Sequence, residues 1–457
     1  MEYNDFIKSA AHVVPSARQL AWYDTQFYAF VHFTVNTYTD LEWGLGTEDE
    51  NIFNPTELDC DQWVEAVKSA GMKGIILTAK HHDGFCLWPT ETTSHSVKNS
   101  RWRDGKGDVV KECAEACKRG GIKFGVYLSP WDRNCPIYGS AAYNDFYCAQ
   151  LTELMTNYGE LFLVWFDNAC GEGPNGRKQE YDFPRYIEII RKYQPNACIF
   201  NDHGPDVRWC GNEAGLARRT EWAVVPYDLC HLAEKQTEAG PGDGSLEFLD
   251  NQSECIGDLH TIRYASGLVF CGAEIDMSIR PGWFYHEYEK PHALERLVRT
   301  YLNSCGANTS FNLNIPPMPN GKFHPDDVTR LKELGNALHE MFGKEKQVPY
   351  TRIDTPLGKD GTQCHIKLKL PESAEVAYIE LKEDIETGQR VEHFRIMSLC
   401  RDNGAPTCFI RSNIFEGYTI GNRKICQVNT APTNEIEIQI LSARDTVEIK
   451  DIIIYKK

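Results

Sequence analysis

The chain of 457 residues is long enough for a large catalytic domain and a smaller second domain. Its formal net charge of −17 argues against nucleic acid or an anionic membrane surface as a partner. The first residues contain no basic segment followed by an apolar run, and no stretch approaches the about 18 consecutive apolar residues of a membrane span. Seventeen cysteines without CxxC pairs fit a reducing compartment. We therefore expect a cytoplasmic protein, with a periplasmic or secreted form that has lost its signal as the alternative.

Short apolar runs and amphipathic stretches alternate along the first part of the chain, at intervals of roughly 40 residues. The predicted strands are Phe27–Phe33, Lys73–Lys80, Lys123–Ser129, Leu161–Asp167 and Ala197–Asp202. The predicted helices between them are Asp61–Ala70, Asp108–Arg119, Asp145–Tyr158 and Phe183–Tyr193. This order indicates βα units in a parallel sheet. A doubly wound open sheet is the alternative, but no GxGxxG or P-loop sequence follows any of these strands.

The pattern is weaker between residues 206 and 278, where two segments, Glu221–Val225 and Gly267–Cys271, are weakly predicted strands. It resumes with a helix, a strand that would close the sheet and a final helix, at Glu287–Asn303, Ser310–Ile315 and His324–Phe342. We therefore predict an α/β fold, a (β/α)8-like TIM barrel over residues 1–345.

The remaining residues, 346–457, have a different character. Segments such as Cys364–Leu370 and Glu435–Leu441 alternate apolar and polar side chains, and short polar turns separate them. This pattern predicts a C-terminal β-sandwich domain. No aromatic platform is evident there, so we expect the sandwich to support the barrel and not to bind sugar.

A carboxylate, Asp167, ends the apolar run of the fourth predicted strand. Side chains alternate along a strand, so Leu161, Leu163, Trp165 and Asp167 would share one face. A carboxylate at the C-terminal end of a buried strand suits an active site at the mouth of a parallel barrel. The competing interpretation is that Asp167 caps the next helix.

Other polar or aromatic residues also end predicted strands. They are His32, His81, His82, Tyr127 and Trp165. Each alone is more often a packing residue, but four successive strands that end this way favour a site. The His81-His82-Asp83 sequence could suggest zinc, yet adjacent strand residues point to opposite faces and the HExxH spacing is absent. We therefore expect no metal and no cofactor.

Two carboxylates at one mouth would suit hydrolysis by paired acid and nucleophile chemistry. No GxSxG sequence supports a serine nucleophile. The residues alone leave the partner of Asp167 open among Glu172, Glu180, Asp202, Asp206, Glu213 and Glu221.

Five motifs occur in an order that resembles the α-L-fucosidases of glycoside hydrolase family 29. They are FVHF around His32, LEWG around Glu42 and Trp43, KHHDGFCLW at Lys80–Trp88, GVYLSPW at Gly125–Trp131 and LVWFD at Leu163–Asp167. The sequences VRWCGNEAG at Val207–Gly215 and MSIRPGWFYH at Met277–His286 are similar to the subgroup that acts on α1,3/4-linked fucose in Lewis-type glycans.

The resemblance implies a role for each matching residue. Asp167 would be the nucleophile and Glu213 the acid/base. The positions that match fucose-ring contacts are His32, Glu42, Trp43, His81, His82, Tyr127 and Trp165. Trp283 would line the site, on the side of either fucose or the aglycone.

The expected activity is that of a retaining exo-α-L-fucosidase that releases fucose from α1,3/4-linked oligosaccharides or glycoconjugates, its only expected partners. Three alternatives remain at this point: a fucose-binding protein without turnover, a glycosidase for a related sugar such as α-L-galactose, and a metal-dependent hydrolase. The sequence does not indicate the oligomeric state.

Overall fold

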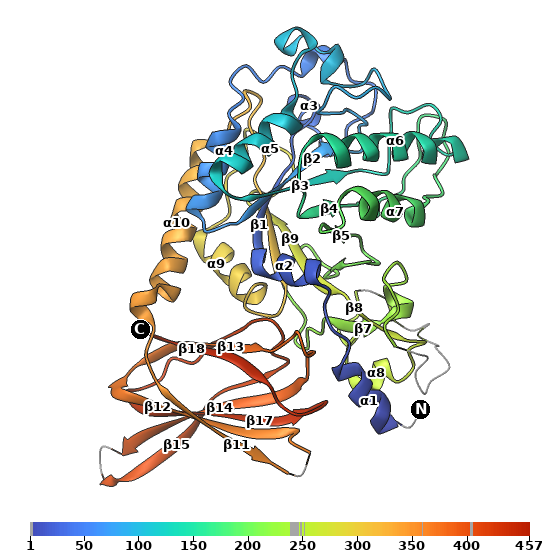
Figure 1. Cartoon of the computed structure of the whole chain (residues 1–457). Helices are drawn as coiled ribbons and strands as arrows, with labels where there is room; N and C mark the ends of the chain where they lie inside the picture. Colours follow the sequence, from blue (N-terminus) through green and yellow to red (C-terminus); the bar gives the residue numbers. More distant parts are fainter. Residues whose placement is uncertain (1–2, 238–245, 247–248, 251, 359, 403–404) are drawn as a thin grey trace.

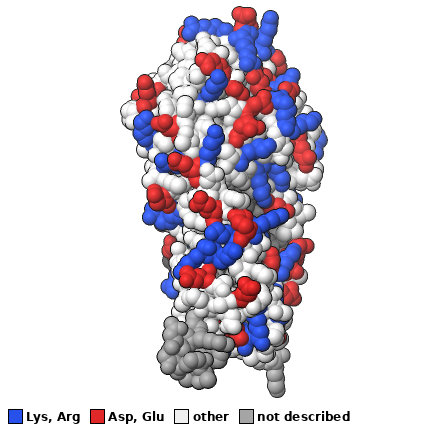
Figure 2. All heavy atoms as spheres, turned by 90° about the vertical axis from the view of Figure 1, so that its left-hand side faces the viewer, with Lys and Arg blue, Asp and Glu red and all other residues white. Residues whose placement is uncertain are grey.

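The computed structural model describes residues 3–237, 246, 249–250, 252–358, 360–402 and 405–457. It consists of a closed parallel barrel with helices packed around it and a C-terminal part made of antiparallel sheets (Figure 1). Within the described part of the chain, every helix is too short or too polar to traverse a bilayer. On the face shown in Figure 2, acidic and basic side chains are interspersed, so the negative net charge does not gather there into one acidic patch.

The barrel has eight parallel strands in the order β1-β10-β9-β6-β5-β4-β3-β2. Their bounds are β1 Phe27–Val31, β2 Gly74–Lys80, β3 Lys123–Leu128, β4 Leu163–Trp165, β5 Cys198–Phe200, β6 Val207–Trp209, β9 Gly272–Ser278 and β10 Ser310–Asn314. The predicted TIM barrel is therefore confirmed. Since all strands run the same way, their carboxyl ends open at one mouth.

Most of the helices surround the barrel (Figure 1). Their bounds are α1 Tyr3–Ala11, α2 Ala17–Thr25, α3 Asn36–Thr39, α4 Cys60–Ser69, α5 Val109–Gly120, α6 Ala141–Asn157, α7 Phe183–Tyr193, α8 Leu259–Ile262, α9 Leu294–Asn303 and α10 Pro325–Phe342. Side-chain caps explain several starts: Asp59 accepts the backbone N–H of Gln62, and Asp108 accepts that of Lys111, both at 2.9 Å.

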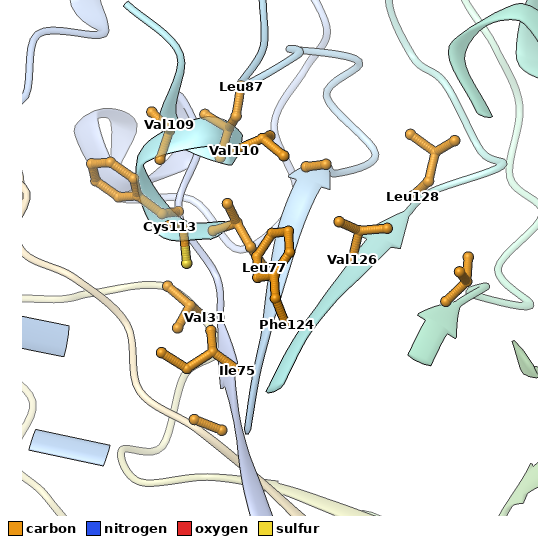
Figure 3. Close-up of a cluster of buried hydrophobic side chains, with 14 of the residues drawn as sticks. Val31, Ile75, Leu77, Leu87, Val109, Val110, Cys113, Phe124, Val126 and Leu128 are labelled. Atoms are coloured by element: carbon orange, nitrogen blue, oxygen red, sulfur yellow. The ribbon is translucent and has the colours of Figure 1, made fainter. Parts of the chain in front are cut away.

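The side of the barrel that faces the helices is apolar (Figure 3). Alternate residues of the strands point at α5; they include Ile75, Leu77 and Val126. Val110 and Cys113 of α5 pack against them. All five are fully buried. Burial of one such large apolar side chain contributes about 1.5–3 kcal/mol, so this contact holds α5 against the strands.

In the middle of the chain both weakly predicted strands are present, whereas one predicted helix begins later than expected. The weakly predicted strands form β7 (Val224–Pro226) and β8 (Leu268–Phe270), which pair antiparallel with each other outside the barrel. The strands that complete the barrel are β6 and β9. The helix expected from Glu287 begins at Leu294, because Pro291 disfavours helical backbone in the residue before it.

The C-terminal part is the predicted β-sandwich, with a five-stranded sheet β11-β12-β17-β14-β15 and a three-stranded sheet β16-β13-β18. The strands are β11 Thr351–Leu357, β12 Gln363–Ala374, β13 Val376–Glu383, β14 Val391–Asp402, β15 Ala405–Tyr418, β16 Lys424–Gln427, β17 Thr433–Ala443 and β18 Ile449–Lys456. The sandwich contacts the barrel part directly: the Arg444 guanidinium lies 3.4 Å from the ring centre of Trp222. Asn308 donates its backbone N–H to Arg423 at 2.9 Å.

Candidate active site

The floor of the barrel mouth is aromatic. Tyr127 on β3 and Trp165 on β4 are partners across the two strands, and their ring centres lie 5.3 Å apart. Trp165 stacks on Phe200 at 4.1 Å and donates its indole N–H to Glu274 at 2.7 Å. Leu161, expected on the same face, instead precedes β4 and packs among the residues between barrel and helices, because the strand begins two residues later.

Asp167 lies at this floor and is held by two hydrogen bonds. The Tyr127 hydroxyl donates to Oδ2 at 2.9 Å, and the backbone N–H of Ala169 donates to Oδ1 at 2.7 Å. A quarter of the side chain is exposed, so the carboxylate can be reached from the mouth. Asp167 caps no helix, since α7 has Asp182 at its N-cap. The carboxylate is therefore accessible and fixed in orientation.

Three buried histidines line the mouth beside Asp167. Burial lowers the pKa of His32 to about 4, lowers that of His81 well below its ordinary value and also lowers that of His82. His32 Nδ1 donates to the Asn314 side-chain oxygen at 2.8 Å, because the amide nitrogen of Asn314 is engaged as a donor elsewhere. The imidazole of His32 thus presents Nε2 as an acceptor.

The tautomer of His82 follows from a similar argument. The single hydroxyl proton of Ser129 goes to the carbonyl of Trp131 at 2.7 Å, so Ser129 Oγ accepts from His82 Nδ1 at 2.7 Å. Nε2 of His82 then carries a lone pair, 3.8 Å from Asp167 Oδ2. His82 also packs on Trp131, a residue that sequence reasoning gave no role, with ring centres 4.8 Å apart.

The rim of the mouth carries the remaining residues that were singled out in the sequence. Trp43 is 60% exposed, and its ring lies 6.1 Å from that of His82. Trp283 lies 5.2 Å from His32, ring centre to ring centre. Glu42 accepts the backbone N–H of Trp283 at 2.8 Å.

Glu213 lies on the loop that follows β6. It is exposed at the mouth. Partial burial and the charge of Asp167 raise its pKa, while a hydrogen bond with the side chain of Trp283 opposes the shift. Glu213 therefore interacts with both Asp167 and Trp283, and it holds its proton more strongly than an ordinary glutamate does.

The other candidate carboxylates differ in their surroundings. Glu172 and Glu180 are exposed. Asp206 is buried between Arg18 and Arg191, and Glu221 between Arg208 and Arg218. Asp202 lies near Asp167, and burial together with that charge raises its pKa to about 6.

Two buried acids on β9 escaped sequence reasoning. Burial raises the pKa of Glu274 to about 7, and burial with nearby negative charge raises that of Asp276 well above its ordinary value. Asp276 accepts the indole N–H of Trp209 at 3.0 Å. In the sequence GAEIDMS of β9, Glu274 and Asp276 alternate with apolar residues, and this alternation could have identified them as neighbours on one face of a strand. Among the described residues, no group of three or more His, Cys, Asp or Glu side chains is placed to hold a metal ion.

Comparisons with known proteins agree with this geometry. A family model described as Alpha-L-fucosidase matches residues 9–223. Alpha-L-fucosidase 1 of Arabidopsis thaliana is 37% identical, over 94% of this chain and 85% of the relative. The chain belongs to the α-L-fucosidase family, glycoside hydrolase family 29.

Solved structures of the family resemble the whole chain. A putative α-L-fucosidase from Bacteroides ovatus superposes with a TM-score of 0.89 and 40% identity, over 100% of this chain and 76% of that one. A family 29 fucosidase from Ruminococcus gnavus, solved in complex with fucose, gives a TM-score of 0.82 and 27% identity, over 98% and 95% of the chains. As a family member, the protein is a glycoside hydrolase.

The ion cluster around Glu221 gives a prediction about stability. Replacement of Glu221 by alanine leaves Arg208 buried without its carboxylate partner, which we expect to cost about 3–5 kcal/mol of unfolding free energy. The urea unfolding midpoint measures this loss. Hydrolysis by the folded variant should persist, because the cluster lies outside the mouth. An unchanged midpoint would contradict the prediction.

Proposed function

We propose that this family member is a retaining exo-α-L-fucosidase, with Asp167 as nucleophile and Glu213 as acid/base, which prefers α1,3/4-linked fucose on branched glycans. The observation that supports it most is the interaction of an anchored carboxylate with a second carboxyl group whose pKa is raised. A retaining glycosidase needs one ionised and one protonated carboxyl group across the scissile bond.

The reaction proceeds in two displacements. An oxygen of Asp167 attacks the anomeric carbon while Glu213 transfers its proton to the glycosidic oxygen, so the aglycone leaves as an alcohol and a fucosyl ester remains. Glu213, now ionised, then takes a proton from water, and the water oxygen displaces Asp167 from the same carbon. Two inversions give α-L-fucose with retained configuration and restore both carboxyl groups.

The roles of the other residues follow from their chemistry. Neutral His32 and His82 with lone pairs on Nε2 accept hydrogen bonds from sugar hydroxyls, and His81 borders the same pocket. Trp165 and Trp43 offer apolar surface to the methyl group of a 6-deoxy sugar. The hydroxyl of Tyr127 holds the nucleophile in its attacking orientation.

The preference for α1,3/4 linkages rests on the sequence around Glu213 and Trp283. Incubation with Lewis a or Lewis x trisaccharide, beside α1,2-linked 2′-fucosyllactose, tests it. We expect chromatography to detect free fucose from the Lewis sugars alone. Release of fucose from both substrates would contradict the proposed α1,3/4 preference. Release from neither would favour a fucose-binding protein or a glycosidase for a related sugar.

A further inference from the structure

Two loops at the barrel mouth meet at His286, a residue with no role in the scheme above. His286 lies in the segment between β9 and α9, whereas Asp40 and Glu42 follow β1. Nδ1 of the imidazole is 2.5 Å from Asp40 Oδ1, and Nε2 is 2.7 Å from Glu42 Oε1. The side chain of His286 is 5% exposed, while that of Asp40 is 66% exposed.

Both ring nitrogens of His286 therefore face carboxylates. An ionised carboxylate only accepts hydrogen bonds, so each nitrogen must donate, and the ring that satisfies both is an imidazolium. Burial alone would lower the pKa of His286, but Asp40 and Glu42 raise it above its ordinary value, with a further contribution from Glu289. The ring of Tyr288 packs against the imidazole at 5.5 Å.

Glu42 connects this cation to the loop that carries Trp283. Its Oε2 accepts the backbone N–H of Trp283 at 2.8 Å, and its Oε1 accepts that of Phe284 at 3.2 Å. The approach is close: a Cβ on Gly282 would lie 2.6 Å from Glu42 Oε1 and 2.9 Å from the His286 ring. A larger residue at position 282 would displace the Glu42 carboxylate and the imidazole of His286 from their present positions.

From Trp283 the contacts reach the reacting groups. Its carbonyl accepts the side-chain N–H of Asn314 at 2.8 Å, and the side-chain oxygen of Asn314 accepts from His32 Nδ1 at 2.8 Å. Its side chain also forms a hydrogen bond with Glu213. A displacement of this loop would therefore move both a sugar-facing imidazole and the acid/base.

We propose that His286 is a positioning residue, an imidazolium that ties the loop after β1 to the loop after β9 and so holds Glu42 and Trp283 against the pocket. This inference rests on the proposed roles of Glu42, His32 and Glu213. Loss of the proton leaves one nitrogen with a lone pair against a carboxylate, which releases the loops. The clamp is therefore expected below the pKa of His286 and lost as the pH rises through it.

Asp40→Asn is the decisive variant, because it removes one countercharge and keeps the shape of the side chain. Asp40 has a φ of 58°, which asparagine tolerates. We expect the alkaline limb of kcat/KM to move to lower pH by about half a unit or more, because a carboxylate partner no longer favours the cation. The substrate is 2-chloro-4-nitrophenyl α-L-fucoside, whose leaving group does not need protonation by Glu213.

His286→Ala is the second variant, and we expect kcat/KM to fall about 10- to 100-fold through misplacement of the loops. Glu416→Gln is the matched control, since Glu416 pairs with His393 at 2.8 Å in the sandwich, and its profile should equal that of the wild type. Calorimetric binding of L-fucose over the same pH range gives a readout independent of turnover.

A uniform loss in Asp40→Asn without a shift of the limb would overturn the inference and leave a purely structural contact. Unchanged profiles, activity and binding in both variants would overturn it as well. If His286→Ala does not fold, Asp40→Asn alone decides. A wild type that cleaves the aryl fucoside but not Lewis trisaccharides would contradict the proposed linkage preference and leave this test intact.

Discussion

Replacement of Asp167 by alanine is expected to reduce hydrolysis of every fucoside by about 10⁴- to 10⁶-fold, as removal of an enzyme nucleophile does. Without the Asp167 carboxylate, the proposed fucosyl ester cannot form. The side chain is partly exposed, and its removal leaves one hydroxyl and one backbone N–H accessible to water. We therefore expect a folded protein with an unfolding midpoint close to that of the wild type.

Azide distinguishes a nucleophile from a residue that only binds. In Asp167→Ala a small anion can occupy the vacated space and attack the anomeric carbon, giving a fucosyl azide of inverted, β configuration. Proton NMR of the product detects it. Asp202→Ala is the matched control, because this carboxyl group also lies near Asp167. Azide rescue of Asp202→Ala, with none for folded Asp167→Ala, would transfer the role of nucleophile to Asp202.

The first half of the barrel could be predicted because its strands bury apolar side chains on both faces. Ile75 and Leu77 face the helices and Ile76 faces the interior, so the run reads as a strand without knowledge of its neighbours. The strands β6 and β9 could not be predicted this way. Arg208 and Glu274 are buried in them, and a polar side chain in a core is stable only with partners from elsewhere in the chain.

The same distinction separates the site residues that sequence reasoning found from those it missed. His32 and Asp167 stand at the ends of recognisable strands, and a local pattern identifies them. His286 becomes interpretable only through Asp40, a residue 246 positions away. Trp131 likewise is connected to the site only through its packing on His82. Contacts at the mouth between residues far apart in the chain produce no periodic pattern in a single sequence.

Glu213→Ala should have the second-largest effect, and one that depends on the substrate. Loss of a general acid typically costs 10²- to 10⁴-fold, so we expect kcat/KM on a Lewis trisaccharide to fall by about that factor. A sugar alcohol is a poor leaving group and needs the proton that Glu213 supplies. The 2-chloro-4-nitrophenolate of an aryl fucoside leaves without it, so kcat/KM on that substrate should fall by less than about tenfold.

The pH dependence provides an independent check. Burial and the charge of Asp167 raise the pKa of Glu213, so this acid keeps its proton up to a higher pH than an ordinary glutamate does. The wild type should therefore stay active on natural glycans up to that higher pH. Above that pKa the proton is lost and kcat/KM declines. In Glu213→Ala the decline with the Lewis substrate that Glu213 causes should disappear, and only the decline expected from His286 should remain.

Asp202→Asn is the control that separates the two carboxyl groups near Asp167. It removes the acid whose pKa is raised to about 6 but leaves Glu213 in place. We expect it to reduce turnover of Lewis and aryl substrates by similar factors and to retain the alkaline limb. A different result would assign the acid/base to Asp202. In that case Asp202→Asn would lose activity on the Lewis substrate but not on aryl fucosides, and Glu213→Ala would lose activity on both substrates equally. The selective loss on poor leaving groups is therefore the measurement that assigns the proton donor.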